Sequence, residues 1–294
     1  MSIWWEVNHV RKLLHANALR LRKSKCFWLG LLFCVLMGGS SPLMSYIDMK
    51  TVQERYDASY IIHLDGGCFS IAVFIGIMAA IFAALFIGTE YSDGTMRNKI
   101  IVGRTRPAIY LANLLTVVGA TTLWLVTYFA CYLAVGVPLL GWFTLEITSI
   151  LILTGMTFAL AFASAAIFVL IAMLCQNKAL SAILCILVAF GMLFVTSYLQ
   201  AILSQPETYT GYDLVDRGDG MLEEVEYTMD NPNYVRGWKR ELYEFLADFI
   251  PAGQALQVTS LDVARPALLS VYSLLIFMLS TGAGIFFFHK KDLK

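Results

Sequence analysis

Charged residues are scarce in this chain, and they are absent from its long apolar stretches. Only 14% of the 294 residues are Asp, Glu, Lys or Arg, whereas 59% are hydrophobic. Soluble domains usually contain about 25% charged and about 45–50% apolar residues. The mean hydropathy of +0.70 points in the same direction. This composition excludes an ordinary soluble protein and indicates one embedded in a membrane.

Six apolar stretches are long enough to cross a bilayer, which requires roughly 20 apolar residues per helix. They are Cys26–Ile47, Cys68–Gly88, Ile109–Val135, Ile147–Leu174, Ala179–Ser204 and Ala267–Phe288. None of them contains Asp, Glu, Lys, Arg or His. The sequence therefore predicts an all-α integral membrane protein with six transmembrane helices.

The uncharged spans argue against ion-coupled transport and make a facilitative channel a weaker alternative. Ion-coupled transporters and proton pumps use ionisable side chains inside the bilayer to bind and release the driving ion. A channel would show a polar or charged ring along its pore, and no such ring is evident. If the chain moves a substrate, we expect the energy to come from another subunit.

Motifs of nucleotide, metal and acyl-transfer chemistry are also missing. The chain has no Gly-Lys dipeptide and so no P-loop, and it has no HExxH, GxSxG or zinc-type Cys/His cluster. Its six cysteines lie in or beside the spans, where they are typical of small apolar side chains. We expect no enzyme activity, no metal site and no cofactor in this chain.

The zero net charge hides a strong asymmetry between the two sides of the membrane. One side, formed by residues 1–25, 89–108, 175–178 and 289–294, has 14 Lys/Arg against 4 Asp/Glu. The opposite side has 7 Lys/Arg against 17 Asp/Glu. The positive-inside rule then places both termini and the loop of residues 86–106 in the cytoplasm. We expect a multi-pass protein of the plasma membrane.

Residues 1–25 precede the first span and have an amphipathic pattern. Their apolar residues recur at helical spacing: Ile3, Val7, Val10, Leu14, Ala18 and Leu21. This pattern predicts an interfacial helix on the cytoplasmic leaflet, in contact with membrane lipid. A simple topology anchor is the alternative.

Small residues form two stripes within the spans. Gly76, Ala80, Ala84 and Gly88 recur at every fourth position of the second span. Gly155, Ala159 and Ala163 repeat the spacing in the fourth span. Such stripes allow helices to approach closely, either within the chain or between two subunits.

The segment 205–266 is the largest part outside the predicted spans, and it is acidic, with 12 Asp/Glu against 5 Lys/Arg. Its first half is rich in turn-forming residues and is predicted to be irregular. Glu241–Ser260 is apolar again, with a helix that Pro251 ends. We expect this part, including Phe249, Gly253 and Gln254, to be interfacial or re-entrant. An ordinary surface helix is the alternative.

The loop 89–108 after the second span combines small and charged residues. Glu90 to Gly94 is predicted to turn, Asp93 or Thr95 to cap a short helix over Met96–Val102, and Gly103 to close it. Basic residues that obey the positive-inside rule explain the arginines but not Glu90 or the glycines.

These residues resemble the permease subunit of type-2 ABC transporters. That family shows G-x-E-Y-x-x-G-T-x-R followed by G-x-S-R, and the chain matches with Gly88, Glu90, Tyr91, Gly94, Thr95, Arg97, Gly103 and Arg106. Thr105 replaces the serine. The sequence DFIPAGQA before the last span is also similar to the family.

The resemblance implies that loop 89–108 docks on a separate ABC ATPase, which binds ATP and magnesium. Met96, Arg97 and Ile100 are the expected contacts, with Glu90 and Arg97 orienting the loop. A second permease chain is the other expected partner, and nucleic acid is not. The implied function is export of a hydrophobic or amphipathic substrate such as a peptide antibiotic, drug or lipid. The alternative is a non-transporting scaffold or sensor whose acidic outer loop binds a ligand.

These expectations divide the chain into four parts. They are the interfacial helix 1–25, the first five spans and the coupling loop in 26–204, the outer segment 205–266, and the last span with a basic tail in 267–294.

Overall fold

The computed structural model describes residues 3–56, 59–216 and 222–291. The described helices and strands are α1 Ile3–Lys23, α2 Lys25–Tyr56, α3 Asp65–Cys68, α4 Ile71–Ser92, α5 Thr95–Ile101, α6 Arg106–Leu140, α7 Ile147–Leu174, α8 Lys178–Leu203, β1 Thr208–Asp216, β2 Leu222–Asp230, α9 Trp238–Phe249, α10 Pro251–Ser260 and α11 Pro266–Lys290.

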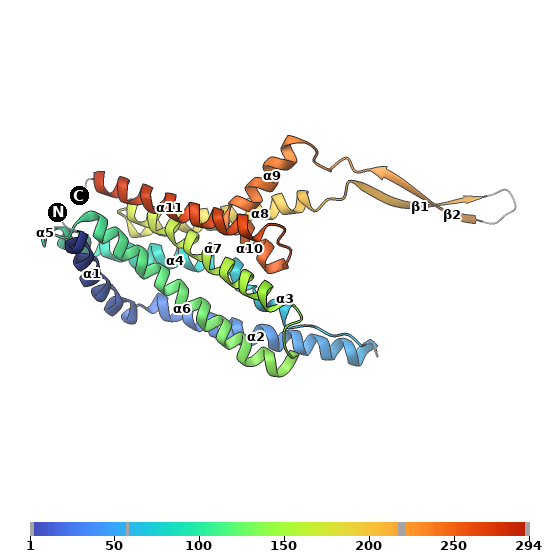
Figure 1. Ribbon diagram of the computed structural model, residues 1–294, viewed down its shortest axis with the longest axis horizontal. Coiled ribbons are helices and arrows are strands. Elements are labelled where there is room, and N and C mark those ends of the chain that lie inside the picture. Colours follow the sequence, from blue (N-terminus) through green and yellow to red (C-terminus); the bar gives the residue numbers. More distant parts are fainter. Residues whose placement is uncertain (1–2, 57–58, 217–221, 292–294) are drawn as a thin grey trace.

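Six of these helices are long and apolar enough to span a membrane, namely α2, α4, α6, α7, α8 and α11. The prediction of an all-α integral membrane fold is confirmed. Figure 1 shows the long helices side by side, with both chain ends and α5 at one end of the bundle and the strands projecting from the other. Several helices extend beyond the predicted spans, most of all α2, which continues to Tyr56, and α6, which continues to Leu140. Hydropathy marks the apolar part of a helix but not where its hydrogen bonding ends.

The centre of the bundle is formed by α4 and α7. In each of these two spans 61% of the most apolar stretch is buried, compared with 22–28% in the other four. α4 packs against α7 and α8, α2 against α6, and α11 against α7. Small side chains make this close packing possible.

The first small-residue stripe lies in this centre. Ala80 and Ala84 are fully buried, and Gly88 is buried against α8. At Gly76 a Cβ would lie 3.5 Å from the hydroxyl oxygen of Ser164 in α7.

The second stripe is only partly buried. Ala163 is inaccessible and Ala159 half-buried, but Gly155 is exposed and no atom lies within 4 Å of the Cβ it would carry. The interpretation that Gly155 packs against another helix of this chain is therefore wrong, because this position of α7 faces outward. A subunit interface there stays a prediction.

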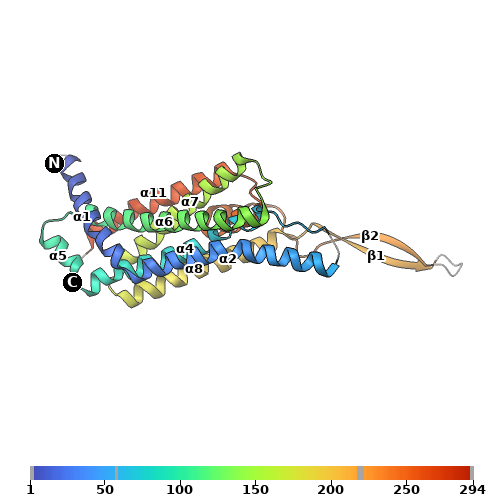
Figure 2. The same cartoon turned by 90° about the horizontal axis from the view of Figure 1, so that it is seen from below.

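The N-terminal helix α1 packs against the spans. Only Ser24 separates it from α2, and it packs against α6 with Leu13 and Asn17 buried. Figure 2 shows α1 angled against the end of the bundle near α5.

The first half of the acidic outer segment forms a hairpin, so the prediction of irregular structure was wrong. β1 and β2 pair in an antiparallel register, with Thr208 opposite Asp230 and Tyr212 opposite Glu226. In β2 the apolar or aromatic residues Val225, Tyr227 and Met229 alternate with polar ones, which is the period of a strand. The turn-forming residues between the two runs drew attention away from this alternation.

Candidate functional site

The motif loop forms the short helix α5, which lies between α4 and α6. Gly94 occupies its N-cap position with a φ of +67°, and no side chain caps the helix. The predicted cap by Asp93 or Thr95 is wrong, because the reversal between α4 and α5 requires a left-handed residue at that position. The hydroxyl of Thr95 instead donates to the backbone carbonyl of Glu90 at 3.1 Å.

The end of α5 is closed by Gly103, as predicted. Its φ is +81°, and its N–H donates to the carbonyl of Ile100 at 2.9 Å. The N–H of Arg104 donates to the carbonyl of Lys99 at 3.0 Å. This pair of bonds is a Schellman motif, which satisfies the last carbonyls of a helix. α5 is thus a defined helical turn rather than an irregular loop.

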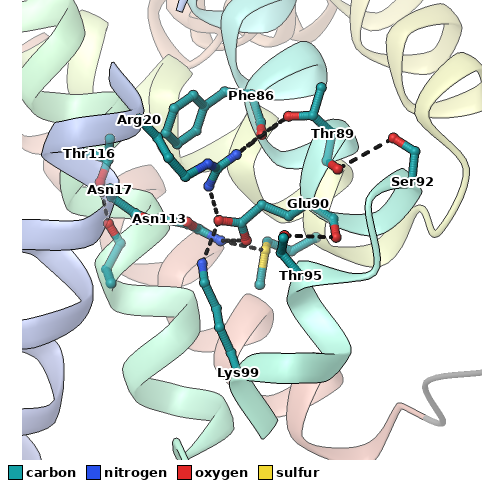
Figure 3. Close-up of polar contacts among 12 residues, drawn as sticks. Asn17, Arg20, Phe86, Thr89, Glu90, Ser92, Thr95, Lys99, Asn113 and Thr116 are labelled. Atoms are coloured by element: carbon teal, nitrogen blue, oxygen red, sulfur yellow. Dashed lines mark hydrogen bonds and ion pairs between the residues drawn. The ribbon is translucent and has the colours of Figure 1, made fainter. Parts of the chain in front are cut away.

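The carboxylate of Glu90 is completely buried beneath α5. It accepts hydrogen bonds from the guanidinium of Arg20, the ammonium of Lys99 and the side-chain amide of Asn113 (Figure 3). The donors come from α1, α5 and α6, while Glu90 itself lies in the last turn of α4, which ends at Ser92. A buried charge is tolerated only when it is paired and hydrogen-bonded. Glu90 therefore joins four helices at one point.

Polar side chains extend this network into α1 and α6. The side-chain amide of Asn17 donates to Asn113 Oδ1 at 2.9 Å and to the hydroxyl of Thr116 at 3.1 Å. Arg20 also donates to the carbonyl of Phe86 at 3.0 Å, and its guanidinium lies 4.4 Å from the centre of the Phe86 ring. These contacts hold α1 against α4 and α6.

Four residues of this network were missed by sequence reasoning: Asn17, Arg20, Asn113 and Thr116. The available signal was an isolated amide within an apolar run. An amide in a membrane span needs a hydrogen-bond partner, so Asn113 in the third span should have prompted a search for one.

Burial lowers the pKa of Lys99 below its ordinary value, and the neighbouring carboxylate of Glu90 acts in the opposite direction. The ammonium group is thus retained under α5 because Glu90 is there. Removing the carboxylate would leave Lys99 with the unfavourable effect of burial alone.

Two further motif residues hold the spans together. The hydroxyl of Tyr91 donates to the carbonyl of Met173 at 2.6 Å, which joins α4 to the end of α7. At Gly88 a Cβ would lie 3.0 Å from Cγ and 3.1 Å from Cα of Lys178, at the start of α8. Only glycine lets α8 approach α4 this closely.

The predicted partner surface needs correction at Met96 and Ile100, and the loop residue Arg106 contacts the last span. Met96 is 2% exposed, so it packs into the protein's own core, and Ile100 is partly buried against that core. Arg106 donates to the backbone carbonyls of Phe288 and His289 at the end of α11, at 3.3 and 2.8 Å.

The outward side of α5 instead carries Arg97, Ile101 and Val102. Arg97 is exposed, as expected for a partner contact. Ile101 and Val102 are each 74% exposed and were not predicted. The helix therefore has a core side centred on Met96 and an outward side that is partly apolar.

At the other end of the bundle, α9 and α10 meet at Ile250. Pro251, Gly253 and Gln254 are buried, and α10 packs against α4, α7 and α8. Gln254 donates to the carbonyl of Asp248 at 2.9 Å and accepts from the hydroxyl of Ser273 at 2.5 Å.

Phe249 lies in an aromatic cluster with Phe245 and Tyr272. Gly253 allows the close turn, because its Cβ would lie 2.1 Å from the carbonyl oxygen of Ala247. The segment enters between the spans, and its re-entrant position in a bilayer stays a prediction.

Among the residues that the structure describes, no group of three or more His, Cys, Asp or Glu side chains is placed to hold a metal ion. The chemistry of the described site is hydrogen bonding and ion pairing.

The comparison with protein families shows which family this chain belongs to. The model of the ABC-2 family transporter proteins matches residues 13–193. The chain belongs to this family. Its match begins in α1 and ends in α8, so it includes the whole Glu90 network. No curated protein matches the chain.

Membership of the ABC-2 family makes the chain a multi-pass permease subunit of a membrane transporter. Such a subunit is the membrane component rather than the ATPase, and it works with an ABC ATPase. The family therefore favours the transport prediction over the scaffold alternative.

Proposed function

We propose that this ABC-2 permease drives export across the plasma membrane and that α5 is the coupling helix that docks on the ATPase. The observation that carries the proposal is that α5 has one buried side and one exposed side. One side is fixed to the protein core by Met96 and Lys99, whereas the other exposes Arg97, Ile101 and Val102. An exposed apolar pair flanked by a cation is suited to a groove on a partner protein.

The Glu90 network supplies a physical connection from α5 to the spans. Because Glu90 contacts α1, α5 and α6 from the end of α4, a displacement of α5 would be transmitted to all of these helices. Rigid-body movement of packed helices is an established way of changing access to a pathway. ATP and magnesium bind to the ATPase in this scheme, and this chain needs no cofactor.

The orientation follows from the charges and from the position of the chain ends. α5 lies at the same end of the bundle as both termini (Figure 1), where basic residues are in excess. With the positive-inside rule, this end lies in the cytoplasm, where the ATPase is found.

A substrate with apolar surface suits the walls of this permease. A cavity of about 550 Å³ between α2 and α4 is lined almost entirely by apolar side chains. Its lining includes Leu29, Phe33, Phe74, Met78, Ile81 and Trp124. We propose that two permease chains pair to enclose the pathway and that a peptide antibiotic, a drug or a lipid passes through it.

The docking assignment is tested by purifying the permease with the ATPase encoded beside it. Ile101→Asp with Val102→Asp should abolish co-purification, because both side chains would place a charge in an apolar contact. Tyr56→Asp is the matched control, since Tyr56 is 69% exposed at the opposite end of the bundle. A second readout is ATP-driven uptake of an amphipathic dye into inside-out vesicles. If the double variant still assembles with the ATPase and still takes up the dye, the docking assignment is wrong.

A further inference from the structure

The β1–β2 hairpin has two chemically different faces. Residues opposite each other in an antiparallel pair point to the same side, and successive residues alternate. The register therefore places Tyr209, Val225, Tyr227 and Met229 on one face, together with Gly211 and one acidic residue, Asp213. The other face carries Glu224, Glu226 and Asp230 with three threonines and Tyr212. We call the first set the aromatic face.

In the part of the chain that the structure describes, the large side chains of the aromatic face are exposed. The exposed fractions of its four large side chains are 41% for Tyr209, 43% for Val225, 41% for Tyr227 and 55% for Met229. Figures 1 and 2 both show the hairpin projecting beyond the ends of the long helices, away from the bundle. Gly211 leaves room for the Tyr227 ring, because a Cβ there would lie 2.6 Å from it.

The base of the hairpin is fixed, so the face is held in a defined place. Asn231 is 5% exposed, donates its side-chain amide to the carbonyl of Pro206 at 2.8 Å, and donates its backbone N–H to the carbonyl of Glu207 at 2.9 Å. Arg236 forms ion pairs with Glu207 and Asp230.

Both long edges of the hairpin are also open. In the part of the chain that the structure describes, the sheet has only these two strands, so each leaves one edge of backbone donors and acceptors unpaired. A two-stranded hairpin is marginal by itself and gains stability when a third strand or an apolar surface is added. Open edges beside an aromatic face are the elements of recognition by strand addition.

Charge decides which occupant fits. Residues 208–230 contain seven Asp/Glu and one Arg. A second copy of the hairpin would bring the same excess of negative charge against it, which is repulsive at the contact distance. An anionic membrane surface is also disfavoured, and the hairpin points away from the helices rather than along the membrane plane.

We propose that this hairpin is a docking arm for a cationic, amphipathic polypeptide segment. The segment binds in extended form, with its apolar side chains on the aromatic face and its basic side chains towards the acidic residues. The hairpin lies beyond residue 193, where the family match ends. Binding requires neither ATP nor the ATPase, so this inference stands apart from the proposed transport function.

The test uses full-length protein in nanodiscs of phosphatidylcholine, whose zwitterionic surface does not attract basic peptides. The probe is a dye-labelled octapeptide in which lysine alternates with valine and phenylalanine, and binding is followed by fluorescence anisotropy. Tyr209→Ser, Tyr227→Ser and Met229→Ser together should weaken binding roughly tenfold or more. Tyr212→Ser, on the opposite face and 63% exposed, should change it by less than about twofold.

Two further variants measure the contribution of the acidic side chains to binding and that of the hairpin as a whole. Glu224→Gln with Glu226→Gln should weaken binding and reduce its dependence on salt, because fewer ion pairs form. Replacing residues 208–230 by a short Gly-Ser linker should abolish binding while leaving co-purification of the ATPase intact.

The inference is overturned if the linker variant binds the octapeptide as well as the parent does, or if an octapeptide with glutamate in place of lysine binds equally. Hairpin-dependent cross-linking of two permease chains, with no peptide binding, would make the hairpin a self-association element and would also overturn it. Neither result would affect the docking of α5, which is tested separately.

Discussion

Asn113 in α6 donates its side-chain amide to the carboxylate of Glu90 at 3.1 Å, and both side chains are fully shielded from solvent. The carbonyl oxygen of the same Asn113 accepts from Asn17 in α1. One amide thus connects the motif carboxylate to the N-terminal helix. The contacts around Glu90 consequently form a single network whose parts should respond together to substitution.

Glu90→Gln is expected to destabilise the permease and to weaken coupling. The substitution leaves the guanidinium of Arg20 and the ammonium of Lys99 without a counter-charge near the core. Breaking a fully buried pair costs about 3–5 kcal/mol. We expect about 2 kcal/mol here because 33% of the Arg20 side chain reaches solvent, which screens its charge. Thermal unfolding in detergent should show a midpoint lower by roughly 5 °C.

Asp93→Asn is the control for this change. Asp93 is an exposed carboxylate in the same loop, three residues from Glu90. Its substitution should shift the unfolding midpoint by less than about 1 °C, because surface charges contribute little. An equal shift in the two variants would show that net loop charge, rather than the buried network, sets the stability.

Lys99→Met should be harmful in the parent but beneficial in the Glu90→Gln background. Burial already lowers the pKa of Lys99, and Glu90 is the group that opposes this effect. Once the carboxylate is neutral, deleting the ammonium removes an unpaired buried charge. The double variant should therefore recover about half of the stability lost by Glu90→Gln. A double-mutant cycle of unfolding midpoints measures this coupling, and additive effects would contradict it.

Glu90 could be recognised from sequence because it lies in a motif, whereas its pairing with Arg20 and Asn113 could not. Arg20 lies 70 positions before it and Asn113 lies 23 after it, in segments whose own patterns give no register against the second span. Local periodicity predicts that a helix forms and which residues share a face. It does not predict which helix packs against that face.

The short helix α5 shows the same limit. Its boundaries and its closing glycine were predictable, since Gly103 has the φ that a Schellman motif requires. Which apolar residues point inward depends on α4, so Met96 was expected outside and Ile101 was not considered. The hairpin differs, because the alternation in 224–230 was visible in the sequence and was outweighed by nearby turn residues.

Gly88→Ala and Gly155→Ala are expected to have opposite effects although both occur in small-residue stripes. At Gly88 the added methyl would lie 3.1 Å from the backbone Cα of Lys178, so α4 and α8 must separate. This overpacking should cost about 1–2 kcal/mol. At Gly155 the space is open, and alanine should stabilise α7 by up to about 1 kcal/mol. The measurement is thermal unfolding of the two variants in the same detergent. Destabilisation by Gly155→Ala would contradict the prediction and would indicate that another molecule, such as a second permease, packs against Gly155.

Arg106→Met should loosen the end of α11 without disturbing α5. Arg106 begins α6 but donates to the carbonyls of Phe288 and His289, in the last turn of α11. Removing these charge-assisted hydrogen bonds should raise amide hydrogen exchange over 284–290 roughly threefold to tenfold, equivalent to about 0.7–1.4 kcal/mol. Arg97→Met is the matched control, since Arg97 is exposed on α5 and should leave exchange at α11 unchanged. Faster exchange at α5 but not at α11 in Arg106→Met would mean that this arginine serves the motif loop, as the sequence first suggested, rather than the end of the last span.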